Sequence, residues 1–282
     1  MNAIKDIMKS LTAKSFSVIL TIFILLTATC LSPVIAGAGP KDAPEETDPA
    51  AEWFNKGLYF DSTGDYPAAI EAYSKVIILT PEHADAYNNR AAAYRKLGFH
   101  DKAIADLNRA ILINPDDPDY YFNRGAAYKE KGALTEAIDD YTKTISLNPE
   151  DADAYNNRGI AYARSGHAGK AEADFTKAIL IDPHFPDFYY NRAVVLHSKG
   201  ALDAALEDYK LTIKQDPEYA PAYYNLACIY SIKKELKTAC EYLQNAVDKG
   251  FTAFEQMEND NDLENLRKEK CFASVMERKG KK

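Results

Sequence analysis

The sequence of 282 residues is dominated by a repeat of 34 residues. Proline recurs at this interval, at Pro81, Pro115, Pro149, Pro183 and Pro217. Glycine recurs with the same period, at Gly64, Gly98, Gly132, Gly166 and Gly200. No insertion interrupts the register, so six units are predicted between residues 50 and 253. Units of this length stack on their neighbours, which predicts one packing environment used six times instead of a single large core.

Each unit has the pattern of two helices. With residue 50 as position one, an aromatic side chain stands at position four, Gly or Ala at eight, and an aromatic residue or Leu at eleven. These spacings put the three side chains on one helical face. Gly at fifteen ends this first helix, and proline at thirty-two ends a second one. Small residues at eight and at twenty let the two antiparallel helices approach closely.

This pattern resembles the tetratricopeptide repeat family over residues 50–253. The resemblance implies an all-α, right-handed superhelical solenoid of six helix hairpins. The predicted repeats are residues 50–83, 84–117, 118–151, 152–185, 186–219 and 220–253. Residues 254–282 carry apolar side chains at helical spacings and end in a basic tail. We expect them to form one or two capping helices that cover the apolar end of the array.

The N-terminal 49 residues have a different character. Lys5, Lys9 and Lys14 precede an uncharged apolar run, and small residues follow it, which predicts a secretory signal peptide over residues 1–36. Two alternatives stay open: an uncleaved membrane anchor, because residues 15–40 are uncharged, and a lipoprotein signal at Cys30. Residues 37–49 are rich in proline and acid and are predicted to be a disordered linker. The protein is therefore expected to be exported, either periplasmic or secreted, or anchored in the membrane and facing the periplasm.

Two charged columns vary together along the repeats. Position seven is Arg in the four middle repeats, at Arg90, Arg124, Arg158 and Arg192. Position twenty-three is Asp in the same repeats, at Asp106, Asp140, Asp174 and Asp208. Arg and Asp are absent together in the first repeat, which has Lys56 and Ala72, and in the last, which has Leu226 and Tyr242. Since the two positions are equally far from the turn at fifteen, we predict a partly buried ion pair within each hairpin; the alternative is that both columns are inherited copies without contact.

The resemblance implies that the first helices line a concave groove for an extended peptide. Position six, which faces this groove, is Asn in every repeat: Asn55, Asn89, Asn123, Asn157, Asn191 and Asn225. An amide donates and accepts, so this column can bind peptide backbone, and it resembles the asparagine ladder of O-linked N-acetylglucosamine transferase. A duplicated repeat whose Asn bonds locally is an equally good interpretation. Further candidate binding residues are apolar, acidic and basic neighbours of this column: Phe122, Tyr190, Tyr224, Asp119, Asp153 and Lys129.

Several other functions find no support in the sequence. The net charge of −8 argues against a nucleic-acid partner. The family's carboxylate clamp for chaperone C-termini needs Lys or Arg at positions two, five and six, which hold Asp, Asn or aromatic residues here. The five histidines lack metal-ligand spacing and are expected to be solvated, and Asp260 and Asp262 do not complete a calcium loop. Cys228 and Cys240 stand near mirror positions of the last hairpin, which allows either a disulfide or two small buried side chains.

We therefore expect no catalytic residue, metal or cofactor, and a membrane contact only through the N-terminal segment. The predicted function is a non-catalytic scaffold that binds an extended peptide or partner protein, in bacterial envelope assembly. Two alternatives are a regulatory or substrate-recruiting module of an envelope enzyme, and a self-assembling structural protein.

Overall fold

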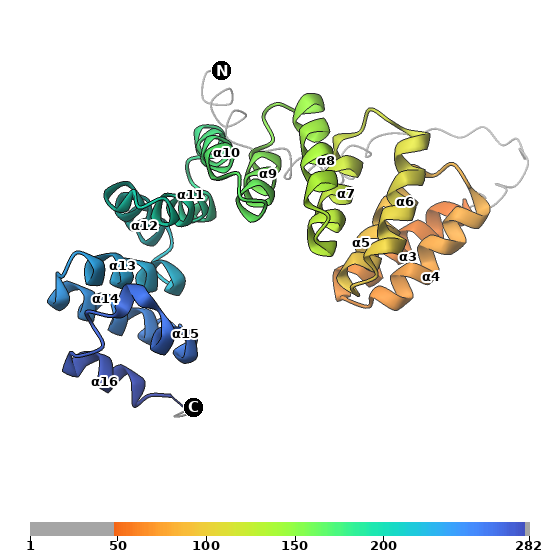
Figure 1. The fold of residues 1–282 in the computed structure, drawn as a ribbon. Helices are drawn as coiled ribbons and strands as arrows, with labels where there is room; N and C mark the ends of the chain where they lie inside the picture. Colours follow the sequence, from red (N-terminus) through yellow and green to blue (C-terminus); the bar gives the residue numbers. More distant parts are fainter. Residues whose placement is uncertain (1–47, 280–282) are drawn as a thin grey trace, which may run out of the picture. The chain divides into compact units, whose positions relative to one another are not determined.

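The computed structural model describes residues 48–279 and consists of successive helical hairpins (Figure 1). The first three hairpins are α3 (Pro49–Thr63) with α4 (Tyr66–Leu79), α5 (Ala84–Lys96) with α6 (His100–Ile113), and α7 (Pro118–Lys131) with α8 (Leu134–Leu147). The next three are α9 (Ala152–Arg164) with α10 (Ala168–Ile181), α11 (Pro186–Ser198) with α12 (Leu202–Gln215), and α13 (Ala220–Ile232) with α14 (Leu236–Asp248). The chain is thus the all-α solenoid of six hairpins that the sequence predicts.

The predicted signal peptide, its membrane-anchor and lipoprotein alternatives, and nearly all of the linker lie outside the described residues. Within residues 48–279, every helix is either too short or too polar to cross a membrane.

The helix ends follow from the residues that the period repeats. Asp48 and Asp151 accept hydrogen bonds from the backbone N–H groups of Ala50 and Ala154, which caps α3 and α9. Gly132 ends α7 with a φ of 87°, and its N–H reaches back to the carbonyl of Lys129. The last repeat has Lys234 in place of this glycine, and its φ of 62° keeps the same left-handed turn.

In three hairpins a glycine of the first helix meets an aromatic ring of the second, at Gly57, Gly125 and Gly159. A Cβ added to Gly159 would lie 2.7 Å from the ring of Phe175, and one on Gly57 would lie 2.4 Å from the ring of Tyr73. Both rings are at most 1% exposed. The absence of a side chain at position eight therefore lets an aromatic ring fill the space between the two helices.

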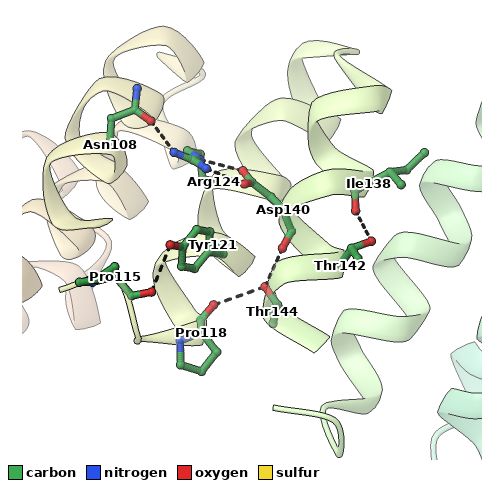
Figure 2. Close-up of polar contacts among 9 residues, drawn as sticks. All are labelled: Asn108, Pro115, Pro118, Tyr121, Arg124, Ile138, Asp140, Thr142 and Thr144. Atoms are coloured by element: carbon green, nitrogen blue, oxygen red, sulfur yellow. Dashed lines mark hydrogen bonds and ion pairs between the residues drawn. The ribbon is translucent and has the colours of Figure 1, made fainter. Parts of the chain in front are cut away.

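The predicted Arg–Asp pairs are present in the four middle hairpins. Figure 2 shows the third repeat, where Nε and Nη2 of Arg124 on α7 donate to both carboxylate oxygens of Asp140 on α8, at 2.8 and 2.7 Å. The third guanidinium nitrogen donates to Asn108 of the preceding hairpin at 2.7 Å. The same two-oxygen geometry joins the other predicted pairs, Arg90–Asp106, Arg158–Asp174 and Arg192–Asp208.

Each of these arginines also bonds the hairpin before it, which the sequence did not predict. The acceptors are the side chains of Ser74, Asn108, Thr142 and Thr176, which all stand at position twenty-five. The hydrogen bond to Asp140 raises the pKa of Arg124, although burial opposes the shift. The guanidinium groups therefore fix the geometry within one hairpin and its register with the preceding one.

Residues after the sixth hairpin pack against its open end. They form α15 (Phe254–Asn259), a short 3₁₀ helix η3 (Asn261–Leu263) and α16 (Lys270–Met276). Fully buried Met257, Leu263 and Val275 join Leu243 and Ala246 of α14 in one apolar cluster. A disulfide joins Cys240 of α14 to Cys271 of α16, so the suggested pairing of Cys240 with Cys228 is wrong. The actual partner of Cys240 lies in the cap, and the 34-residue pattern does not predict where the cap packs.

Candidate functional site

The asparagine column lies on the first helices of the hairpins. Successive first helices contact one another, α5 with α7, α7 with α9 and α9 with α11. The side chains at positions five, six, nine, twelve and thirteen of these helices define what we call the ladder face. This face holds most of the binding residues that the sequence predicts.

Two of the asparagines donate to an asparagine of the preceding repeat. Nδ2 of Asn123 donates to Oδ1 of Asn88 at 2.9 Å, and Nδ2 of Asn191 donates to Oδ1 of Asn156 at 2.9 Å. Each bond runs from position six of one repeat to position five of the repeat before it. It uses one of the two N–H donors of the amide, so the second N–H and the carbonyl oxygen can bond a ligand.

The other asparagines have different surroundings, because position five alternates between Asn and an aromatic ring. Asn225 donates to the Tyr190 hydroxyl at 3.3 Å, whereas Asn89 accepts from Asn88 at 3.3 Å. Asn55 in the first repeat is exposed. Asn157 donates to the backbone carbonyl of its own Asp153 at 2.9 Å. The column therefore contains two Asn–Asn pairs between repeats, and Asn157 and Asn225 contact the preceding repeat through Lys129 and Tyr190 instead.

The aromatic residues at position five pack onto the core rings of their own hairpins. Phe122 contacts Tyr141 with ring centroids 5.6 Å apart, and Tyr190 contacts Tyr209 at 5.7 Å. Phe122 and Tyr190 keep partly exposed edges on the ladder face. Tyr224 differs, because it is only 2% exposed and its hydroxyl donates to Asp260 of the cap at 2.5 Å. Its side chain thus supports the cap and offers little surface to a ligand.

A basic cluster of Arg95, Lys129 and Arg164 occupies the middle of the ladder face. Lys129 is partly buried, and its Nζ donates to Oδ1 of Asn157 at 2.5 Å. Arg164 donates to the backbone carbonyl of Lys129 at 3.3 Å. Burial lowers the pKa of Lys129, and the charges of Arg95 and Arg164 lower it further against the opposing effect of Glu130. Three cationic side chains thus lie close together at this site, and one of them, Arg95, forms an ion pair with Glu130 at 3.7 Å.

The acidic margin stands at position two of the first helices. Asp85 accepts a hydrogen bond from the hydroxyl of Tyr120 at 2.6 Å, which ties the second repeat to the third. Burial raises the pKa of Asp119, and the neighbouring charges of Asp117, Asp151 and Asp85 raise it further. Asp153 is exposed on the same helix as Asn157. These contacts indicate that part of the margin has a structural role between repeats.

The structure also brings together four side chains that the sequence analysis set aside. His197 of α11, Cys228 of α13, Asp260 at the N-cap of η3 and Asp262 within η3 line a cavity of about 570 Å³. The expectation of solvated histidines fails for His197, whose side chain is only 15% exposed. Cys228 is free, buried and 1% exposed, and burial raises the pKa of its thiol, as do the nearby carboxylates. No spacing rule could reveal this cluster, because the fold of the cap delivers the two aspartates.

Fold and ladder face together define a helical-repeat protein of the kind that binds other proteins. Residues 57–98, 93–132 and 127–166 match a family model described as TPR repeat. Residues 156–220 and 209–241 match models described as tetratricopeptide repeat. The matches together extend over more than half of the chain. The chain belongs to the tetratricopeptide repeat family.

Solved structures of the same class are similar to this chain. MamA protein is 26% identical, with a TM-score of 0.54, and the match covers 61% of this chain and 94% of MamA. YrrB, described as a TPR protein with an unusual peptide-binding site, is 25% identical with a TM-score of 0.54, covering 64% of this chain and 94% of YrrB. The pilF protein of Pseudomonas aeruginosa has a TM-score of 0.66 at 18% identity, covering 74% of this chain and 95% of pilF, and shows the fold alone. No curated protein sequence matches the chain.

Proposed function

We propose that this protein is a non-catalytic scaffold that binds an extended, acidic segment of a partner protein along its ladder face. The observation that carries the proposal is the partly buried Lys129, held against Asn157 between Arg95 and Arg164. A carboxylate bound here would satisfy a desolvated positive charge with charge-assisted hydrogen bonds. The asparagine column would bind the backbone on either side of that carboxylate.

The contacts of the asparagines indicate which amide groups hold the repeats together and which can bind a ligand. Asn123 and Asn191 each donate one amide N–H to the preceding repeat, which fixes the spacing of the column. Their second N–H and their carbonyl oxygen can bond a ligand. The edges of Phe122 and Tyr190 would supply apolar contacts beside the amides. The similarity to YrrB, which is described as having a peptide-binding site, supports a peptide ligand.

We also propose that the protein works outside the cytoplasm, in the bacterial envelope. The basic and apolar N-terminal pattern supports export. The disulfide between Cys240 and Cys271 supports it independently, because such bonds persist in oxidising compartments.

The test is a crosslinking pull-down of the full-length protein from the cells that produce it. A variant with Asn89→Ala, Asn157→Ala and Lys129→Met loses amides and the charge on the ladder face. Its matched control carries Asn114→Ala, Asn245→Ala and Lys143→Met, all at exposed positions away from that face. Loss of a hydrogen bond to a charged group is worth about 1.5–3 kcal/mol, so partner recovery should fall at least about tenfold in the ladder variant. Equal recovery with both variants would refute the proposed binding face.

A further inference from the structure

Three separate segments converge at the C-terminal end of the ladder face. His197 is at position twelve of α11, Cys228 is at position nine of α13, and Asp260 and Asp262 flank the start of η3. The sulfur and one carboxylate oxygen from each aspartate lie within 4.8 Å of one another. Nε2 of His197 lies 3.3 Å from Oδ2 of Asp262. A nitrogen, a sulfur and two carboxylates thus face a shared cavity.

The spacing of these atoms suits a tetrahedral metal. Zinc bonds of about 2.3 Å to sulfur and 2.0 Å to oxygen or nitrogen place two ligand atoms roughly 3.3 to 3.5 Å apart. The distance from Nε2 of His197 to Asp262 is 3.3 Å, and that from Sγ of Cys228 to Asp260 is 3.8 Å. The ligand atoms of Cys228, Asp260 and Asp262 lie within 4.8 Å of one another, and His197 approaches this group through Asp262. The side chains would therefore have to move together by about 1 Å or more around the metal.

One polar atom of the cluster lacks the partner that burial requires. Nε2 of His197 is buried and lies 3.3 Å from Oδ2 of Asp262, but within the described part of the chain it makes no contact with hydrogen-bond geometry. Buried polar atoms nearly always have a well-aligned hydrogen bond, and a metal between this nitrogen and the carboxylate would satisfy both groups. Imidazole and thiolate favour zinc and related transition metals, whereas calcium and magnesium take oxygen ligands.

From this geometry we propose that His197, Cys228, Asp260 and Asp262 form a binding site for a divalent transition metal, with Zn²⁺ as the preferred ion. The Zn–S bond forms as the S–H bond of Cys228 breaks, and that proton leaves to the solvent. The Tyr224 hydroxyl donates to Oδ2 of Asp260, and the Asp262 N–H donates to Oδ1 of the same carboxylate. These two hydrogen bonds fix the orientation of the Asp260 carboxylate, as hydrogen bonds to metal ligands commonly do.

The metal would link three elements that are far apart in the sequence. It would fasten the cap segment carrying Asp260 and Asp262 to α11 and α13, where the ladder face ends. The disulfide between Cys240 and Cys271 fastens the opposite part of the cap to α14. The site therefore fixes the end of the ligand-binding face and does not depend on which ligand that face binds.

Titration of the metal-stripped, full-length protein with Co²⁺ alone tests the site, with competition by Zn²⁺ giving the zinc affinity. All variants carry Cys30→Ser and keep the disulfide intact, so that Cys228 is the single free thiol. We expect a thiolate-to-cobalt charge-transfer band in this parent protein and none after Cys228→Ser. His197→Ala and Asp262→Asn should each weaken Zn²⁺ binding by at least about tenfold, and Tyr224→Phe by about tenfold.

The matched controls are His184→Ala and Asp116→Asn, two exposed positions far from the cavity, which should keep the parent affinity. Zn²⁺ should raise the thermal midpoint of the parent and of both controls by more than it raises that of His197→Ala. Because His197→Ala retains the thiol, it stays informative if Cys228→Ser does not fold. Absence of the charge-transfer band in the parent, or equal Zn²⁺ affinity in the parent, His197→Ala and Asp262→Asn, overturns the proposal.

Discussion

Arg124 donates from Nε and Nη2 to the two carboxylate oxygens of Asp140, while its Nη1 reaches Asn108 of the preceding repeat. The side chains are 20% and 7% exposed, so both charges are held largely away from water. This geometry explains why Arg and Asp appear together in the middle repeats and disappear together in the outer ones. A buried charge without its partner is costly, so loss of one residue favours loss of the other.

Asp140→Ala should therefore destabilise the protein by about 3 kcal/mol, because it leaves the Arg124 guanidinium buried without a counter-charge. The double variant Arg124→Met, Asp140→Leu should recover most of this loss, since it removes both charges and keeps the volume. Urea unfolding followed by circular dichroism measures both effects. Lys131→Ala, which removes the exposed ion pair with Asp101, serves as the control and should leave the midpoint almost unchanged. A double variant as unstable as Asp140→Ala alone would contradict this explanation.

The contact between Gly159 and Phe175 predicts a coupled effect on packing. A Cβ at Gly159 would lie 2.7 Å from the ring, so Gly159→Ala should cost about 1–3 kcal/mol from overpacking, less the helix-propensity gain of up to about 1 kcal/mol. Phe175→Leu makes room, as in the second repeat, which carries Ala91 and Leu107 at the same positions. A double-mutant cycle in urea measures the coupling. If Gly159→Ala lowers the free energy of unfolding equally with Phe175 present and with Phe175→Leu, the ring is not the reason why glycine is required.

Asn191 and Asn55 share a repeat position but differ in their contacts, which predicts different effects on stability. Asn191→Ala removes the N–H that bonds Asn156, which is 8% exposed, and should cost about 1–3 kcal/mol. Asn55→Ala removes an exposed amide from a helix and should change the free energy of unfolding by less than about 0.5 kcal/mol. Denaturant midpoints of the two variants give the comparison. Equal effects would mean that the pairing of Asn191 with Asn156 does not contribute to stability.

We expect the substitution Lys129→Met to increase the stability of the protein and to weaken its binding of acidic segments. Because burial and two arginines lower its pKa in the folded state, the unfolded chain binds more protons between that lowered pKa and the ordinary value near 10.5. The contribution of Lys129 to the unfolding free energy should therefore rise with pH through this window, and the stability difference between Lys129→Met and the unmodified protein should shrink over the same range. At neutral pH the same variant should unfold at a higher denaturant concentration while losing affinity for acidic segments.

The control for this prediction is Lys143→Met, at an exposed position on α8, which should preserve the pH dependence and the binding. A lower midpoint for Lys129→Met at neutral pH would show that the lysine stabilises the fold, which contradicts a site held ready for an anionic ligand.

The six hairpins and the Arg–Asp pairs could be predicted from the sequence because each rests on a residue type that returns every 34 positions. The pairing of Asn123 with Asn88 could not, although its signal is present: position five alternates between aromatic residues and Asn over two repeats. The charge balance at Lys129 depends on how three neighbouring first helices pack. The convergence of His197 and Cys228 with Asp260 depends on the fold of the cap, where the 34-residue period no longer applies.

Site-specific photocrosslinking in living cells tests most directly whether the ladder face binds the partner. A photoreactive residue at Leu58 or Val194, both at position nine of first helices and 43% and 41% exposed, samples the ladder face. The same residue at Leu112 or Leu180, at position twenty-nine of second helices and 71% and 73% exposed, samples the other side. We expect partner crosslinks at Leu58 and Val194 that disappear with Lys129→Met, and none at Leu112 or Leu180. Crosslinks confined to Leu112 and Leu180 would show that the partner binds the second helices and that the ladder face is not the binding site.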